Sequence, residues 1–71
     1  MSTDIVPSVR LANDIAVQFV HRADPEAAAS EIADHVRSFW ESRMIDSLRH
    51  AAGDPSAGLH PLAERAALLL R

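Results

Sequence analysis

The segment DPEAAASEIADHVRSF, residues 24–39, carries the clearest structural signal in the chain. Asp24 is a favoured N-cap residue, Pro25 suits the first helical position, and Glu26 lies at the positive end of the helix dipole. The apolar residues that follow recur at helical spacing and so line one face. They are Ala28, Ala29, Ile32, Ala33, Val36, Phe39 and, just beyond, Trp40. The segment therefore predicts an amphipathic helix with this apolar stripe.

A second helix is predicted upstream, from about Asp4 or Ser8 to about His21, with Pro7 tolerated in its first turn. Its apolar residues cover an arc of about 180°, wider than the roughly 100° stripe that contact with one neighbour requires. They are Val9, Leu11, Ala12, Ile15, Ala16, Phe19 and Val20. This helix is therefore expected to contact two elements, or one element and a partner.

Two shorter helices are predicted downstream. Ser42 is expected to cap the first, which ends at Gly53, and Pro61 opens the second after the loop at 53–58. Leu68 falls outside the apolar stripe of the last helix and suggests a second contact surface. The two stripes comprise Met44, Ile45, Leu48, Ala51 and Ala52, and then Leu62, Ala66, Leu69 and Leu70. Because no strand pattern occurs, we predict an all-α fold, a small bundle of three to four short helices in one domain over residues 1–71.

The composition restricts the classes of function. A chain of 71 residues removes only about 60% of its surface from water on folding, so it must pack closely or gain stability from a partner. The absence of cysteine excludes disulfides, thiolate nucleophiles and iron–sulfur ligation. A net charge of −3 disfavours nucleic acid as a partner. No apolar run approaches the ~20 residues that span a membrane, and no secretion signal is evident, so we expect a cytoplasmic protein without a membrane partner.

The sequence does not predict catalysis or metal binding. His21, His35, His50 and His60 fall on four different predicted segments and form neither an HxxxH pair nor an HExxH motif. Neither glycine opens a phosphate-binding loop, and a small helical bundle has little concave volume from which to exclude water. We therefore expect this chain to hold no catalytic residue, no metal and no cofactor.

The segment HVRSFWESRM, residues 35–44, places the only Trp beside Phe, Met and two Arg residues, a composition typical of an interface hot spot. Core packing is the alternative role for the aromatic residues, and a local salt bridge is the alternative for Arg43. As functions, a self-associating helical protein and a small regulatory DNA-binding module are the alternatives to partner binding. The candidate partner-binding residues are His35, Arg37, Phe39, Trp40, Arg43 and Met44.

Four blocks of the chain carry a family resemblance: RLANDIA at 10–16, HVRSFW at 35–40, Arg43-Met44, and LHPL at 59–62. Together they resemble the delta subunit of cytoplasmic NAD-dependent, molybdenum-containing formate dehydrogenases. Members of that family usually have Asp-Pro where this chain has Glu41-Ser42, and Asp where it has His60. We expect these replacements to weaken the local helix starts, because Asp-Pro is the better combination of cap and first residue.

The resemblance implies a small, non-catalytic accessory subunit that binds and stabilises the large alpha subunit or assists its maturation, within a complex that also contains beta and gamma subunits. It implies that the other subunits carry bis-molybdopterin guanine dinucleotide, iron–sulfur clusters and FMN. The resulting hypothesis is that the six candidate residues form the joint between the second and third helices and contact the large subunit there. The wide stripe of the first helix and Leu68 are secondary candidates for the same surface.

Overall fold

The computed structural model describes residues 7–70. Over this range the chain forms four α-helices and one 3-10 helix, and no strand. The predicted all-α bundle is therefore confirmed. The elements are α1 (Pro7–Val17), α2 (Pro25–Phe39), α3 (Ser42–Ala52), η1 (Pro55–Ala57) and α4 (Pro61–Leu68).

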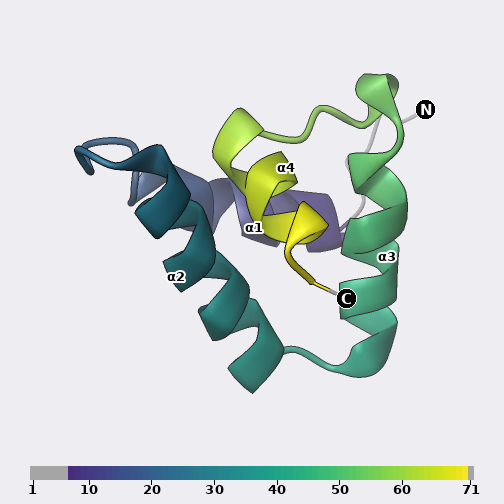
Figure 1. Ribbon diagram of the computed structural model, residues 1–71. Coiled ribbons are helices and arrows are strands. Elements are labelled where there is room, and N and C mark those ends of the chain that lie inside the picture. Colours follow the sequence, from purple (N-terminus) through teal and green to yellow (C-terminus); the bar gives the residue numbers. More distant parts are fainter. Residues whose placement is uncertain (1–6, 71) are drawn as a thin grey trace.

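α4, the shortest of the α-helices, lies at the centre of the fold (Figure 1). α2 and α3 diverge from the short joint that connects them, α4 lies between them, and α1 crosses behind (Figure 1). α2 packs mainly against α4, while α1 packs against both α3 and α4. The C-terminal helix is thus the element that joins the two arms of the bundle.

Alanine dominates the core around α4. The largest fully buried side chains in this core are Ile32 of α2 and Leu48 of α3, with Val36 of α2 beside them. Small side chains let helices approach closely, so backbone and Cβ atoms supply much of the van der Waals contact. The buried alanines of this cluster are Ala12, Ala16, Ala29, Ala33, Ala63, Ala66 and Ala67.

Side-chain polar contacts also join elements that are distant in sequence. Ser8 of α1 is buried, and its hydroxyl shares a hydrogen bond of 2.8 Å with that of Ser47 on α3. A buried hydroxyl without a partner would cost about 1–3 kcal/mol. The pairing therefore fixes the contact between α1 and α3 at low cost.

The first and second helices differ in how well the sequence predicted their ends. α2 begins as expected, because the Asp24 carboxylate accepts a hydrogen bond from the Glu26 N–H at 3.0 Å. α1 ends at Val17 rather than near His21, and the predicted start at Asp4 lies outside the described residues. Tight turns follow α1, with the Phe19 N–H donating to the Ala16 carbonyl at 2.9 Å. These turns keep Phe19 packed against the core, so the apolar spacing continues after the helix has ended.

The third helix begins at Ser42, so the prediction that Ser42 is its cap is wrong by one residue. Glu41 occupies the N-cap position, and its side chain makes no capping hydrogen bond. Gly53 ends α3 as predicted, with a right-handed conformation at φ −88°. The left-handed conformation occurs instead at Gly58, where φ is 78°.

Four residues of the predicted apolar stripes are exposed, namely Leu11, Val20, Phe39 and Leu69. Phe39 is 76% exposed because the last turn of α2 extends past α4, which covers the rest of that face (Figure 1). Leu69 is 48% exposed, whereas Leu70 is buried against the core. α4 ends at Leu68, so the residues after it no longer extend the helix and its stripe.

Candidate partner-binding surface

The joint between α2 and α3 is formed by two residues in extended conformation, Trp40 and Glu41. The Trp40 N–H still donates to the Val36 carbonyl at 2.9 Å, which completes the last turn of α2. One residue later the Glu41 carbonyl accepts hydrogen bonds from the N–H groups of Met44 and Ile45, at 2.9 and 3.0 Å. The change of direction is therefore abrupt, and α2 and α3 diverge from this point.

An aromatic pair occupies the exposed end of α2. The rings of His35 and Phe39 lie one helical turn apart, with their centroids separated by 4.9 Å and their planes inclined by 38°. Both residues are exposed, and Phe39 is the most exposed large apolar residue of the described chain. The contact with His35 limits the positions of the Phe39 ring, so a partner protein would bind an aromatic group that is already partly ordered.

The other candidates at the joint differ in burial. Trp40 is half-buried and packs against the core, and Met44 is half-buried at the start of α3. Arg43 is exposed. The structure thus places an exposed aromatic pair, a partly covered indole and an exposed guanidinium within one short stretch of chain.

Arg37 is directed toward a different part of the fold. Its guanidinium pairs with Asp34 at 2.8 Å and donates a second hydrogen bond to the Leu69 carbonyl at 3.1 Å. The last carbonyls of a helix have no partner within the helix, so this bond satisfies one of them at the end of α4. Arg37 therefore joins α2 to α4 and is not part of the His35 and Phe39 pair.

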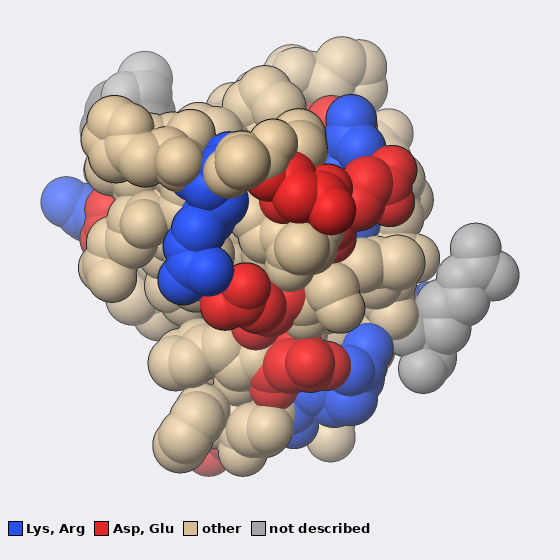
Figure 2. Space-filling model, turned by 60° about the vertical axis from the view of Figure 1, so that its left-hand side comes forward, with Lys and Arg blue, Asp and Glu red and all other residues tan. Residues whose placement is uncertain are grey.

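Charges of both signs alternate on the face of the molecule that contains the outer side of α2 (Figure 2). Arg22 pairs with Glu31 at 2.9 Å, and Arg65 of α4 pairs with Glu26 at 3.1 Å. Three of these side chains are about half-exposed and Glu26 is 82% exposed, so each pair contributes about 0–1 kcal/mol to stability. This face therefore lacks the concentrated positive field that binding a phosphate backbone requires.

The packing of α2 and α3 also differs from a DNA-binding helix-turn-helix. Such a motif is a compact pair joined by a turn of about 3–4 residues, with its second helix presented to the major groove. Here α2 packs mainly on α4, and α3 packs on α1 and α4. The two helices are arms on either side of α4, so they do not form a recognition unit together.

The titratable groups of residues 7–70 include no cluster of three or more His, Cys, Asp or Glu side chains suited to a metal ion.

The Ser56 hydroxyl and backbone N–H both donate to the Asp54 carboxylate, at 2.7 and 2.9 Å, and they hold the pKa of that carboxyl below its usual value. These bonds cap η1, so this shift has a structural cause.

Comparison with protein families identifies the chain. The family model for the NADH-dependent formate dehydrogenase delta subunit FdsD matches residues 9–67. The chain belongs to this family. The match extends from the first turn of α1 almost to the end of α4, so it includes the joint and both arms of the delta subunit. No curated protein and no solved structure gives a match. None of the helices described for the delta subunit is long and apolar enough to cross a membrane.

One surface feature of the delta subunit was not found from the sequence. Two adjoining hollows of about 220 and 140 Å³ lie beside the C-terminal end of α4, and both are lined by Arg49 and Leu70. The sequence signal for this feature was Leu68, which falls outside the apolar stripe of the last helix. In the structure Leu68 is 60% exposed and lines the larger of the two hollows. The role of Arg49 could not be predicted, because the hollows form only when α3 and α4 pack together.

Proposed function

We propose that this subunit of the formate dehydrogenase complex is a non-catalytic accessory subunit that binds the large alpha subunit through the joint between α2 and α3. In this proposal the complex also contains beta and gamma subunits. The other subunits carry bis-molybdopterin guanine dinucleotide, iron–sulfur clusters and FMN. The contribution of the delta subunit is binding energy, which stabilises the alpha subunit or keeps it in a state competent for maturation.

The exposure of Phe39 carries this proposal. At 76% exposure the ring contributes little to the fold of the isolated chain, although it lies beside the half-buried Trp40. Complete burial of such a side chain is worth about 1.5–3 kcal/mol. Aromatic and Arg side chains are also the most common interface hot spots. A partner that covers the joint would gain this free energy without disturbing the core.

Substitutions that leave the bundle intact test this proposal. Phe39→Ala and Arg43→Ala alter exposed side chains, whereas Trp40→Ala would also remove packing from the core. We expect each of the first two variants to weaken binding to the alpha subunit about thirtyfold or more, since truncation of a hot-spot residue costs about 2 kcal/mol or more. The measurement is the recovery of the alpha subunit with a tagged delta subunit, together with formate-dependent NAD reduction.

Val17→Ala is the matched control. Val17 is 58% exposed on α1, so its truncation removes exposed apolar surface at a site distant in sequence from the joint. We expect normal recovery and activity with this variant. Normal recovery of the complex with both Phe39→Ala and Arg43→Ala would overturn the assignment of the joint.

A second measurement separates stabilisation from maturation. The alpha subunit is produced with and without the delta subunit, and its molybdenum and iron contents are determined. Equal metal contents with a lower melting temperature in the absence of the delta subunit would indicate a stabilising role. A loss of molybdenum that later addition of the delta subunit does not restore would indicate a role in maturation.

A further inference from the structure

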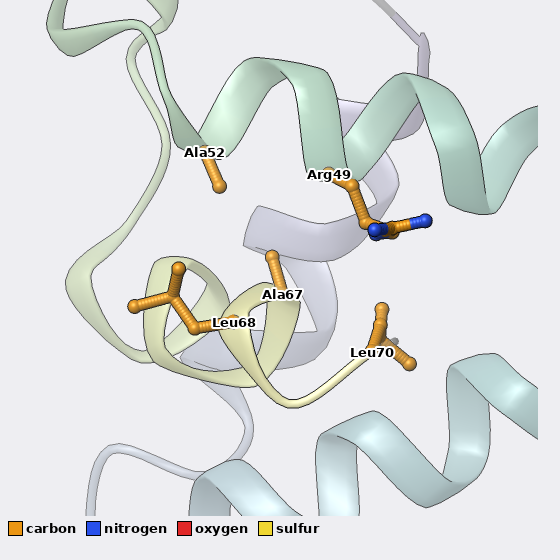
Figure 3. A pocket seen from close by; sticks show the side chains of 5 residues that line it. All are labelled: Arg49, Ala52, Ala67, Leu68 and Leu70. Atoms are coloured by element: carbon orange, nitrogen blue, oxygen red, sulfur yellow. The ribbon is translucent and has the colours of Figure 1, made fainter.

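The two hollows beside α4 adjoin each other. The first is lined by Arg49, Ala52, Ala67, Leu68 and Leu70 (Figure 3). The second is lined by Arg37, Ile45, Arg49 and Leu70. Because they share Arg49 and Leu70, we name the combined feature the arginine groove. Each hollow by itself, at about 220 and 140 Å³, is smaller than the roughly 300–1,000 Å³ typical of cofactor sites and has room for about one side chain.

Two positive charges from different helices line this groove. Arg37 lies on α2 and Arg49 on α3, and both side chains are about half-exposed. Each guanidinium has five N–H donors. Arg37 uses donors for Asp34 and for the Leu69 carbonyl. The nearest acidic atom to Arg49 is on Asp46 at 3.8 Å, which is too long for a hydrogen bond.

The groove therefore offers more donors than the described residues satisfy. Like charges that line one hollow repel each other, and a carboxylate placed between them would relieve this repulsion. Asp34 and Asp46 each lie three residues before the arginine that they approach, on the same helix, and partly offset its charge. Neither of them lines the groove, and among residues 7–70 the charged side chains that line it are Arg37 and Arg49.

The remainder of the lining is apolar. Figure 3 shows Arg49 and Leu70 at one end of the larger hollow, with Ala52 and Leu68 at the other and Ala67 between them. Leu68 remains 60% exposed, although it borders this hollow. A ligand that complements the groove must therefore combine a carboxylate with an adjacent aliphatic group.

We propose that the arginine groove binds an Asp or Glu side chain and a neighbouring aliphatic residue of the alpha subunit. The carboxylate lies between Arg37 and Arg49, and the aliphatic side chain packs against Leu68 and Ala52. This inference rests on the proposed function, because it assigns the ligand to the same partner. It adds a second contact, lined by α2, α3 and the end of α4, to the one at the joint.

Substitutions at Arg49 test the groove most directly. Arg49 makes no hydrogen bond with the described residues, so Arg49→Gln should leave the fold intact. We expect this variant of the full chain to bind the alpha subunit about tenfold more weakly, and with a shallower dependence on ionic strength. Arg49→Glu should bind more weakly still, because it places two carboxylates in contact. Arg37→Gln should act in the same direction, with helical content measured because Arg37 also contacts Leu69.

The matched control is Arg10→Gln, which removes one exposed charge that does not line the groove. We expect its affinity and salt dependence to remain close to those of the unchanged protein. Wild-type affinity for both Arg49→Gln and Arg49→Glu would overturn the inference. The proposed function would then still be decided separately by Phe39→Ala.

A free anion is the other possible ligand of the two arginines. If inorganic phosphate raised the melting temperature of the delta subunit alone, and Arg49→Gln abolished this effect without weakening the alpha-subunit complex, the groove would be an anion site. That result would overturn the inference. Loss of alpha-subunit binding with Arg49→Gln and no effect of phosphate would support it.

Discussion

The side-chain oxygen of Asn13 accepts a hydrogen bond from the backbone N–H of His60 at 2.7 Å. The amide nitrogen of the same side chain donates to the Gly58 carbonyl at 2.9 Å. One residue of α1 thus holds the chain on both sides of Leu59, immediately before α4 begins. Because α4 is the central helix, this contact contributes to the placement of the whole C-terminal segment.

Removal of the Asn13 side chain should therefore destabilise the fold. We expect Asn13→Ala to lower the free energy of unfolding by about 1–3 kcal/mol, because it leaves the half-buried His60 N–H without a partner. Asn13→Asp keeps this acceptor but faces the Gly58 carbonyl with a second oxygen, so it should retain only part of the stability. Urea unfolding followed by circular dichroism gives both values, and equal midpoints for Asn13→Ala and the wild type would contradict the prediction.

His60 caps α4, although the replacement of Asp by His was expected to weaken the start of this helix. Its Nδ1 accepts a hydrogen bond from the Leu62 N–H at 3.0 Å, so the replacement of Asp by His preserves a side-chain cap for α4. We expect His60→Ala to cost about 1 kcal/mol in stability, and His60→Asp to match or exceed the wild type because a carboxylate also favours the helix dipole. Thermal unfolding distinguishes these outcomes. A melting temperature for His60→Ala equal to that of His60→Asp would show that the cap contributes nothing.

The alanine core should not tolerate enlargement. Ala66 is completely buried in the cluster around α4. We expect Ala66→Leu to reduce stability by about 1–3 kcal/mol, since added methylenes force the neighbouring helices apart. Ala27→Leu is the matched control, because Ala27 is exposed on α2 and its change should stay within about 0.5 kcal/mol. Equal unfolding midpoints for these two variants would mean that the contacts around Ala66 are not close-packed.

Asp54 should make stability depend on pH in the acidic range. Its pKa is lowered by the hydrogen bonds from the Ser56 hydroxyl and backbone N–H, so the folded state holds the ionised form more strongly than the unfolded state does. This contribution is complete above the usual Asp value of about 4 and is lost as the pH falls through the lowered pKa.

Asp54→Asn isolates the charge at this position, because the amide oxygen can still accept from the Ser56 N–H. We expect the wild type to be more stable than this variant at neutral pH, with a difference that closes in acid. Urea unfolding at a series of pH values measures it. A difference that stays constant across the series would exclude the charge as its source.

Local signals were sufficient for most of the helical structure. The Asp24-Pro25-Glu26 start of α2 acts within one helical turn, and the structure retains both its cap and its first residue as predicted. The start of α4 at Pro61 is similarly local. By contrast, the end of α1 could not be predicted, because the turns after Val17 maintain the helical spacing of apolar residues through Phe19.

Burial depended on contacts between helices that are far apart in the chain. Phe39 follows the same spacing as Ile32 and Val36, yet it is exposed because α4 covers only part of that face of α2. A periodic pattern identifies the apolar face of a helix, but the length and position of the neighbouring helix determine how much of that face is covered. The six candidate residues lie within ten positions of one another in the sequence, yet Arg37 contacts the end of α4.

Composition and spacing alone therefore established an all-α chain without cysteine, the starts of α2 and α4, and the aromatic segment at residues 35–44. These properties depend on individual residues or on interactions within a few positions. The central position of α4, the exposure of Phe39 and the placement of Arg37 and Arg49 beside one hollow depend on packing across as many as four helices. Such packing is settled by the complementary shapes of distant alanine-rich faces, which no single stretch of the sequence contains.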